Sequence, residues 1–347
     1  MSFLRNAWYV AGWADEFSQQ PFRRKILGED MVLYRTGSGA PVAVSNRCPH
    51  RFAPLHLGRV DGESLACRYH GLAFDKRGVC VANPNGEGIR PAARLKAYPL
   101  AEQDGLVWIW MGSESLAATS PIPAEYRYLL DTTNYRRVKS RMTVQAHYQL
   151  LIDNLLDQAH TVSQHDGSLG SEAIRRARTV IRRESHRVVH ADRWCPDGLA
   201  PPLLDMLFDN FGKPVDHWIN QRWEAPSLLS LDTGVTPAGK PREQGITIRF
   251  AHILTPETST STHYFWALCR DFRKESAGLD KLILENTERI FVDEDKWMLE
   301  AVQTTMATTD FWSLRPALLE GDEAAVVVRR ALDALLAAEA ETIACGP

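Results

Sequence analysis

The sequence predicts an α+β protein of two domains, an all-β N-terminal domain followed by a domain that combines an antiparallel sheet with helices. Three observations support this expectation. The 347 residues suffice for two domains that each bury a core. Residues 1–112 alternate short strand-like runs with turn residues. Beyond residue 140 the apolar pattern changes between long strands and helix period.

The expected strands of the N-terminal domain are short and are separated by glycine-rich turns. They cover residues 31–35, 41–44, 72–75, 78–81 and 106–110. Trp108 and Trp110 lie on one face of the last strand by alternation, and we expect them to pack in the core.

A small, polar, proline-bearing segment at residues 113–123 is the best candidate for a linker. We therefore place the first domain at residues 1–115, the linker at 116–124 and the second domain at 125–347.

Charge and composition exclude several classes of partner. The net charge is −3 and the pI is about 6.4, so nothing indicates binding to nucleic acid or to an anionic membrane. No apolar run approaches the ~20 residues that span a bilayer, and the N-terminus lacks the apolar segment of a signal peptide. We expect a cytoplasmic protein without a membrane partner.

The six cysteines do not show the paired spacing of a disulfide framework. Cys48 and Cys67 belong to the motif described next. The other four are expected to be small buried side chains or free thiols, and they are Cys80, Cys195, Cys269 and Cys345.

Two short arms that each carry one cysteine and one histidine stand sixteen residues apart. The first holds Cys48 and His50, and the second holds Cys67 and His70. A Rieske [2Fe–2S] cluster takes two thiolates on one iron and two imidazoles on the other, which suits such mixed arms. The rival metal is tetrahedral zinc, whose sites usually group the cysteines apart from the histidines.

A helical pattern at residues 148–160 follows the first strand of the second domain. With about 100° per residue, Asp153, Asp157 and His160 fall on the side opposite the apolar stripe. His165 follows five residues after His160, past the expected end of this helix.

The rest of the chain predicts long strands and then helices. The strands cover residues 187–191, 218–223, 228–231, 245–254 and 263–269, and the helices cover 279–308 and 323–338. In the first helix Asp295 shares a face with Leu284, Phe291, Met298 and Val302. A carboxylate on an apolar face must be paired or bound to a metal. The competing carboxylates, Asp293 and Glu294, project away from this face.

His160, His165 and Asp295 together provide two imidazoles and one carboxylate. This set of ligands binds mononuclear non-haem Fe(II) and leaves coordination positions open for dioxygen and substrate.

With these motifs the chain resembles the Rieske non-haem iron oxygenases, in the branch of vanillate O-demethylase, dicamba monooxygenase and toluenesulfonate methyl-monooxygenase. The resemblance rests on C48-P-H, R51-F-A-P-L and C67-R-Y-H-G, and it runs almost from end to end. It implies a Rieske [2Fe–2S] domain followed by a helix-grip catalytic domain that holds the mononuclear iron.

The same resemblance implies roles for two residues beside the iron. Asp157 matches an aspartate that bridges to a Rieske histidine of a neighbouring subunit, here His70, and Asn154 matches an asparagine near the iron. The implied assembly is a homotrimer. Since the chain has no nicotinamide or flavin motif, it implies a separate NAD(P)H-dependent reductase, with a ferredoxin-type carrier as one option.

Candidate substrate contacts are His252, Ser230 and Asn286. His252 alternates with inward apolar residues and coincides with the family's substrate-contacting histidine. Asn286 replaces the tryptophan of the dicamba-type enzymes, and their asparagine near Ser230 is missing, which argues against dicamba-like substrates. Arg222 is a candidate partner for a substrate carboxylate, but we prefer to interpret it as an exposed arginine.

The function implied is oxidative O-demethylation of a methoxylated, vanillate-like aromatic acid with O2, which releases a phenol and formaldehyde. One alternative is hydroxylation of a methyl group or of the ring. A second, of another class, is a non-catalytic Rieske electron carrier joined to a domain that binds an aromatic ligand.

Overall fold

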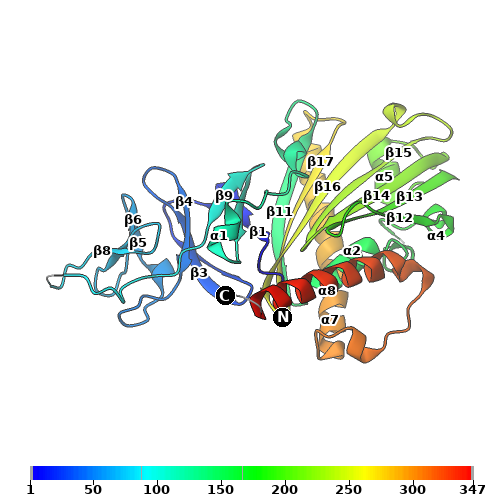
Figure 1. The fold of residues 1–347 in the computed structure, drawn as a ribbon. Coiled ribbons are helices and arrows are strands. Elements are labelled where there is room, and N and C mark those ends of the chain that lie inside the picture. Colours follow the sequence, from blue (N-terminus) through cyan, green and yellow to red (C-terminus); the bar gives the residue numbers. More distant parts are fainter. Residues whose placement is uncertain (1–2, 87, 166, 345–347) are drawn as a thin grey trace. The chain divides into compact units, whose positions relative to one another are not determined.

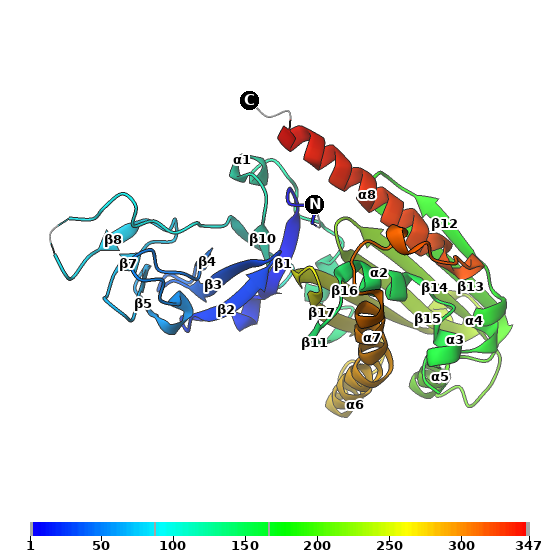
Figure 2. The same ribbon diagram turned by 90° about the horizontal axis from the view of Figure 1, so that it is seen from below.

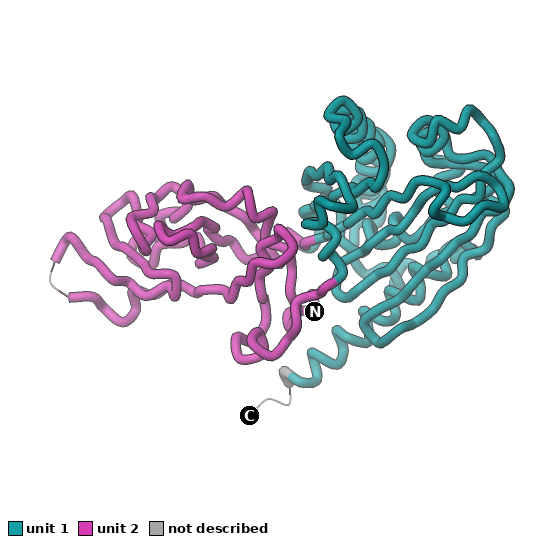
Figure 3. Tube along the Cα trace, turned by 90° about the horizontal axis from the view of Figure 1, so that it is seen from above, with its two compact units in different colours: residues 1–2, 125–254, 259–347 teal, residues 3–124, 255–258 magenta. Residues whose placement is uncertain are grey.

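The computed structural model describes residues 3–86, 88–165 and 167–344, so Cys345 lies outside the described residues. Figure 3 shows that the chain forms two compact units. One contains residues 3–124 and 255–258, and the other contains residues 125–254 and the described part of 259–347. Each unit is described by itself.

The N-terminal unit is built from three small sheets, in the strand orders β1-β10-β9, β2-β3-β4 and β5-β6-β7-β8. All of their pairings are antiparallel. The strands are β1 (Trp8–Trp13), β2 (Phe22–Ile26), β3 (Glu29–Arg35), β4 (Pro41–Ser45), β5 (Arg59–Asp61), β6 (Ser64–Ala66), β7 (Ala73–Phe74), β8 (Cys80–Ala82), β9 (Leu100–Gln103) and β10 (Leu106–Trp110).

Trp108 and Trp110 of β10 are buried, which confirms their predicted packing in the core. The ring of Trp110 meets that of Trp8 edge to face, with centroids 5.4 Å apart. The indole N–H of Trp108 donates to the Gln103 carbonyl, and that of Trp110 donates to the Ser113 carbonyl. Both of these buried donors are therefore paired.

A segment from late in the sequence completes the N-terminal unit. Residues 255–258 belong to the long strand β16 but lie in this unit. The carbonyl oxygens of Pro256 and Glu257 accept hydrogen bonds of 2.8 Å from the N–H groups of Leu27 and Gly28. The chain therefore passes between the two units more than once.

The second unit contains a seven-stranded sheet with the order β11-β17-β16-β15-β14-β13-β12 (Figure 1). The strands are β11 (Arg136–Val144), β12 (Thr179–Arg183), β13 (Val188–Gly198), β14 (Val215–Glu224), β15 (Leu228–Pro237), β16 (Ile246–Thr258) and β17 (Ser261–Arg270). The strand segments predicted from alternation all fall on or overlap these strands.

Helices accompany this sheet. They are α2 (Tyr148–Leu156), α3 (Thr161–Gln164), α4 (Glu172–Arg176), α5 (Pro202–Phe208), α6 (Ala277–Arg289), a π-helical segment (Ile290–Lys296), α7 (Trp297–Met306) and α8 (Glu323–Ala344). Figure 1 shows α8 running alongside α2, and Figure 2 shows α3, α4 and α5 gathered at one end of the sheet. In the described part of the chain, no helix combines the length and the apolar character that crossing a bilayer requires.

The predicted helix of residues 279–308 is interrupted by the π-helical segment. The wider turn of a π-helix shifts the following residues around the axis, so one apolar face cannot continue through it. Phe291 and Asp295 are buried as predicted, but Val302 is 37% exposed and Gln303 is buried instead. A single helical period therefore fails at the position where Asp295 lies.

Candidate functional site

Two loops of the N-terminal unit hold the cysteine and histidine arms in closely similar backbone conformations. The Cys48 N–H donates to the carbonyl five residues later, and its own carbonyl accepts from the N–H four residues later, both at 2.9 Å. Cys67 makes the same two hydrogen bonds with Leu72 and Gly71, at 2.8 and 2.9 Å. The hydrogen-bonding pattern is thus repeated in the two arms.

The fourth residue after each cysteine has a left-handed backbone. It is Gly71 in the second loop, with φ of 77°, and Phe52 in the first, with φ of 60°. Glycine adopts this conformation without steric cost, whereas phenylalanine does not. These residues turn each loop back, so that the histidine and cysteine of one arm reach those of the other.

The four side chains fit the two ends of a Rieske cluster. Cys48 and Cys67 are buried, whereas His50 is exposed and His70 is partly exposed. Burial raises the pKa of the Cys48 thiol, and the adjacent Cys67 thiol raises it further. The two imidazole rings lie together, with centroids 4.4 Å apart. An inner pair of thiols and an outer pair of imidazoles suit one iron with two sulfur ligands and one with two nitrogen ligands.

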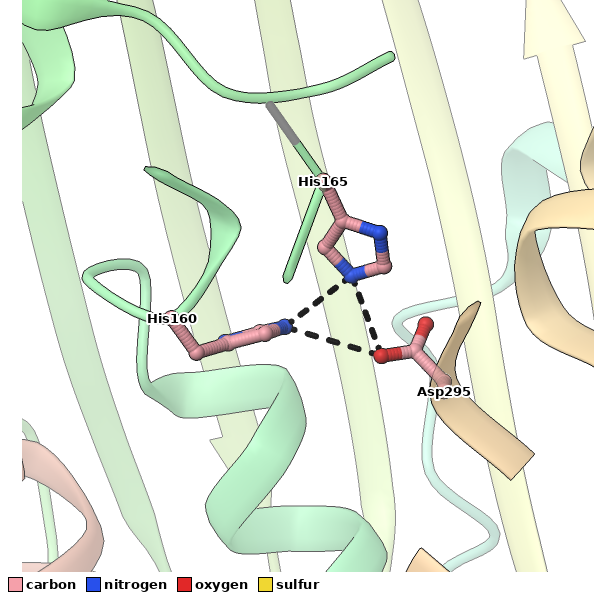
Figure 4. A group of neighbouring side chains, drawn as sticks. All are labelled: His160, His165 and Asp295. Atoms are coloured by element: carbon pink, nitrogen blue, oxygen red, sulfur yellow. Dashed lines mark hydrogen bonds and ion pairs between the residues drawn. The ribbon is translucent and has the colours of Figure 1, made fainter. Parts of the chain in front are cut away.

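In the second unit, His160, His165 and Asp295 point their ligand atoms at one another (Figure 4). The His165 Nε2 lies 3.2 Å from the His160 Nε2 and 3.1 Å from the Asp295 Oδ1. The remaining pair, His160 Nε2 and Asp295 Oδ1, is 3.6 Å apart.

The hydrogen bonds at the Nδ1 atom of each ring show which of its two nitrogens carries the proton. The His160 Nδ1 faces the backbone carbonyl of Asp157, which can only accept, so this nitrogen carries the proton. The His165 Nδ1 lies 2.5 Å from the Glu294 carboxylate, which likewise accepts. In the neutral rings, both Nε2 atoms therefore direct a lone pair at the other and at the Asp295 carboxylate. Three electron-pair donors at these distances fit a shared cation.

Asp295 is suited to remain ionised although it is buried. Burial alone would raise the pKa of its carboxyl group, but the neighbouring imidazoles of His160 and His165 outweigh this and lower it to about 2. The amide groups of Asn154 and Gln164 also donate to its Oδ1, at 3.1 and 3.2 Å. Asn154, predicted to lie near the iron, is thus in contact with a candidate ligand.

Glu294 is a functional residue that the sequence analysis missed. It lies next to Asp295 in the π-helical segment and holds the outer nitrogen of His165, while Asp295 faces the inner nitrogen. Ser168 and Arg289 donate to Glu294 at 2.8 and 2.9 Å. The α-helical period placed this side chain away from the apolar face. The sequence feature that could have identified Glu294 is its position next to the predicted ligand Asp295.

The arrangement of Asp157 also differs from the expectation. Helix α2 ends at Leu156, and Asp157 has an extended backbone with ψ of 97°, so Asp157 and His160 do not share a helical face. No hydrogen bond joins the His160 ring to the Asp157 carboxylate, because the Nδ1–Oδ2 distance is 3.9 Å. The carboxylate instead accepts from the Ala159 N–H at 2.7 Å.

A cavity of about 170 Å³ lies beside the three candidate ligands, and Asn154 and Asp157 also line it. Its lining residues come from the sheet and from the helices of the second unit. Its apolar walls include Leu204, Ile219, Leu231, Phe250, Leu268 and Phe291. Its polar groups include Gln158, His217, Gln221, Thr233 and His252. An apolar cavity with few polar groups, next to a metal site, is typical of a small-molecule binding site.

The candidate substrate residues differ in their relation to this cavity. His252 lines it, stacked on Phe250 with ring centroids 4.4 Å apart. Ser230 does not, because Leu231 and Thr233 line the cavity and alternation turns Ser230 to the other face of β15. Asn286 does not line it either, and its amide donates to the Leu282 carbonyl within α6.

Arg222 is engaged elsewhere, with Glu224 at 2.7 Å and Glu125 at 3.6 Å. His217 and Gln221, on the cavity side of β14, were not predicted as site residues. The alternation that identified His252 could also have identified them, because His217, Ile219 and Gln221 are two residues apart along β14.

Comparison with known families gives two matches. Residues 7–99 match the Rieske [2Fe-2S] domain, and residues 144–338 match the C-terminal domain of the vanillate O-demethylase oxygenase. The first match favours a Rieske cluster over zinc for the cysteine and histidine arms.

Curated relatives match over nearly the full chain. The oxygenase component of chloroacetanilide N-alkylformylase from Rhizorhabdus wittichii (strain DC-6 / KACC 16600) is 45% identical over 97% of both chains. The oxygenase component of dicamba O-demethylase from Stenotrophomonas maltophilia is 39% identical over 98% of this chain and 100% of its own.

Solved structures of dicamba monooxygenase have the same fold. The one bound to 3,6-dichlorosalicylic acid gives a TM-score of 0.92 at 37% identity, over 98% of this chain and 99% of the other. The one with non-heme iron and dicamba gives 0.83 at 36% identity, over the same shares.

Proposed function

Because this chain belongs to the Rieske non-haem iron oxygenases with a vanillate O-demethylase-type C-terminal domain, we propose that it removes an alkyl group from an oxygen or nitrogen atom of an aromatic substrate. It is the oxygenase component, and its cofactors are a Rieske [2Fe–2S] cluster and a mononuclear non-haem iron. The convergence of His160, His165 and Asp295 beside a largely apolar cavity is the observation that carries the proposal.

We assign the cluster to Cys48, His50, Cys67 and His70, and the mononuclear iron to His160, His165 and Asp295. When bound, the mononuclear iron would supply the activation of dioxygen. The residues around it orient and protect the reactants. Glu294 and the Asp157 carbonyl hold the Nδ1 protons, so the Nε2 atoms of the neutral rings face the iron site. The apolar walls keep water away from the substrate carbon that reacts.

The reaction balances as a monooxygenation. One C–H bond of the alkyl carbon becomes C–OH, the second oxygen atom of O2 leaves as water, and two electrons and two protons are consumed. The product hemiacetal or hemiaminal then breaks its C–O or C–N bond and releases an aldehyde together with a phenol or an N–H group. The electrons require a separate reductase, since relatives of this chain are named as the oxygenase components of their systems.

The names of the relatives support both kinds of bond. One relative is named for acting at the nitrogen of a chloroacetanilide and the other for demethylating dicamba at an oxygen. The methoxylated aromatic acid expected from the sequence is one substrate within this class. The non-catalytic electron carrier is wrong, because these full-length relatives are named as oxygenase components.

The test combines metal analysis with product analysis. Purified protein should contain three irons and two acid-labile sulfides per chain. With a surrogate reductase, a panel of O-methyl and N-alkyl aromatic compounds should give oxygen uptake with one aldehyde per phenol or N–H group formed. Oxygen uptake that yields only benzylic alcohols or ring-hydroxylated products would replace dealkylation by the hydroxylation alternative.

A further inference from the structure

We infer that the substrate of this cavity is an uncharged aromatic molecule, an alkylated aryl amide or ether that carries no carboxylate or sulfonate. This inference rests on the proposed function, because it takes the cavity beside the three ligands as the substrate site. It narrows the class of substrate and excludes the aromatic acids expected from the sequence alone.

The first observation is the charge of the cavity wall. Among the described residues that line it, none is lysine or arginine. The charge of a ferrous ion would be offset by the carboxylates of Asp295 and Asp157, which both line the cavity. A substrate anion would therefore lose its hydration without gaining a partner of opposite charge, which is strongly unfavourable.

The arginines of the neighbouring strands do not remedy this. Arg222 pairs with Glu224 and Glu125. Arg249 lies on the other face of β16, over the rings of Tyr128 and Tyr135.

Arg193, on β13, lies close to the cavity wall, but its guanidinium is also engaged. It donates to the Ile174 carbonyl at 2.9 Å and to the Thr179 hydroxyl at 2.8 Å. Ile174 lines the cavity and Arg193 does not.

The second observation is that β14 presents acceptors. The Thr233 hydroxyl donates to the Trp218 carbonyl at 2.8 Å, so it accepts from the His217 Nε2 at 3.2 Å. Burial lowers the pKa of His217 to about 3, which keeps the ring neutral and leaves a lone pair on its Nδ1. This atom is buried and has no partner among the described residues.

Gln221 adds a second acceptor on the same face of β14. Its amide nitrogen donates to the Leu155 carbonyl, which leaves the Oε1 without a partner in the described part of the chain. Two acceptors repel the oxygen atoms of a carboxylate and suit the N–H or O–H group of a neutral molecule.

The third observation is one neutral donor on β16, two strands away from β14 in the same sheet. The Tyr264 hydroxyl lies 2.6 Å from the His252 Nδ1, and burial raises the pKa of this phenol well above its usual value. A phenol is a better donor than acceptor, so it donates to Nδ1 and leaves the proton of His252 on Nε2. That buried N–H has no partner among the described residues and suits a carbonyl or ether oxygen.

The decisive experiment compares an acid with its neutral counterpart on the enzyme loaded with both metals. Binding of 4-methoxybenzamide and 4-methoxybenzoate is measured by calorimetry in the absence of dioxygen and reductant. We expect the amide to bind at least tenfold more tightly at pH 7. Equal or tighter binding of the acid would overturn the inference.

The pH dependence of the same titration shows which form of the acid enters. If only the protonated acid binds, its apparent Kd rises about tenfold per pH unit between pH 6 and 8, while that of the amide stays constant. An apparent Kd that is flat for both compounds would mean that the anion is accepted, which would overturn the inference.

Two variants test the acceptor on β14. We expect the parent protein to bind 4-methoxybenzamide more tightly than its N,N-dimethyl derivative, which has no N–H group to donate to His217. His217→Phe should remove this difference in affinity, whereas His217→Asn, which keeps an accepting oxygen, should retain it. An unchanged difference in His217→Phe would contradict the role of His217 as an acceptor. Failure of dealkylation is a separate result, because it appears as uptake of oxygen without release of aldehyde while the binding preference persists.

Discussion

At the scale of single residues, the mononuclear site depends on two adjacent carboxylates that act on opposite sides of one ring. Asp295 faces the Nε2 of His165, and Glu294 accepts from its Nδ1. Glu294 is itself held by Ser168 and Arg289, so the orientation of the imidazole is determined from outside the ligand set. Partners of this kind set both the tautomer and the basicity of a ligating histidine.

We expect Glu294→Ala to lower the affinity for the mononuclear iron by about 10- to 100-fold, because the His165 ring loses the acceptor that fixes it. The measurement is iron release to a competing chelator, with the cluster absorbance as an internal reference. Asp293→Ala removes the same charge from an exposed neighbour and should leave the affinity within twofold. Equal losses in the two variants would contradict the role of Glu294.

Individual residues also show where prediction from sequence reaches its limit. Asp295 was identifiable because a carboxylate stood on an apolar face, and it is buried with a lowered pKa. Glu294 was not, since an α-helical period cannot describe a π-helical segment. Ser230 was misplaced because the match to relatives gave its position along the chain but not which face of β15 it occupies.

At the scale of elements, α8 packs on α2 through one arginine. The Arg329 guanidinium donates to Asp153 at 2.8 Å and to Gln149 at 2.8 Å, and it lies 4.1 Å from the centroid of the Phe311 ring. Helix α2 begins at Tyr148, and His147 is its N-cap residue. Burial, together with the positive charge of Arg329, lowers the pKa of His147 to about 4.

This lowered pKa makes stability sensitive to acid. The unfolded chain takes up a proton at His147 near pH 6.5, while the folded protein resists protonation down to about pH 4. The unfolding free energy therefore falls as the pH drops below 6.5. His147 should account for a loss of about 2 kcal/mol between pH 7 and pH 5.

We expect His147→Gln to remove this part of the pH dependence, measured as the difference between denaturant unfolding at pH 7 and pH 5. His186→Gln replaces an exposed histidine and serves as the control, with the parental difference retained. A parental pH dependence in both variants would show that His147 is protonated freely in the folded state.

The strands were more predictable than the helices, for a physical reason. Alternation in β16 correctly placed Ile248, Phe250 and His252 on one face, and all three line the cavity. The helix predicted for residues 148–160 ends at Leu156, because the segment after it folds back to bring His160 and His165 together. That turn is determined by tertiary contacts, and the local pattern contains no signal for it.

At the scale of the whole molecule, the proposed function requires electrons to pass from a separate reductase through the cluster to the mononuclear iron. The sequence resemblance implies that this transfer occurs between neighbouring subunits of a homotrimer through Asp157. We propose the same path here. The trimer should appear in light scattering as about three times the chain mass of 39.0 kDa.

Asp157→Asn should keep both metal centres and the trimer but lower turnover by about 100-fold. The amide replaces the carboxylate that we propose to face His70 of the neighbouring subunit, while the Asp157 carbonyl still holds the His160 ring. Iron and sulfide content, together with the Rieske EPR signal, are measured beside the rate. Turnover at the parental rate would exclude the bridging role.

The expected boundary near residue 124 describes a single passage of the chain between the two units, but β16 makes a second one. Residues 255–258 supply backbone acceptors to Leu27 and Gly28, and the Thr255 hydroxyl donates to the Val10 carbonyl. A fragment truncated in the linker would lack this tetrapeptide and leave those groups to solvent. A hybrid oxygenase made by exchanging the N-terminal domain at one splice point would keep residues 255–258 of the original chain. The exchanged domain would then pack against a tetrapeptide from another protein. A functional graft should therefore transplant residues 255–258 with it.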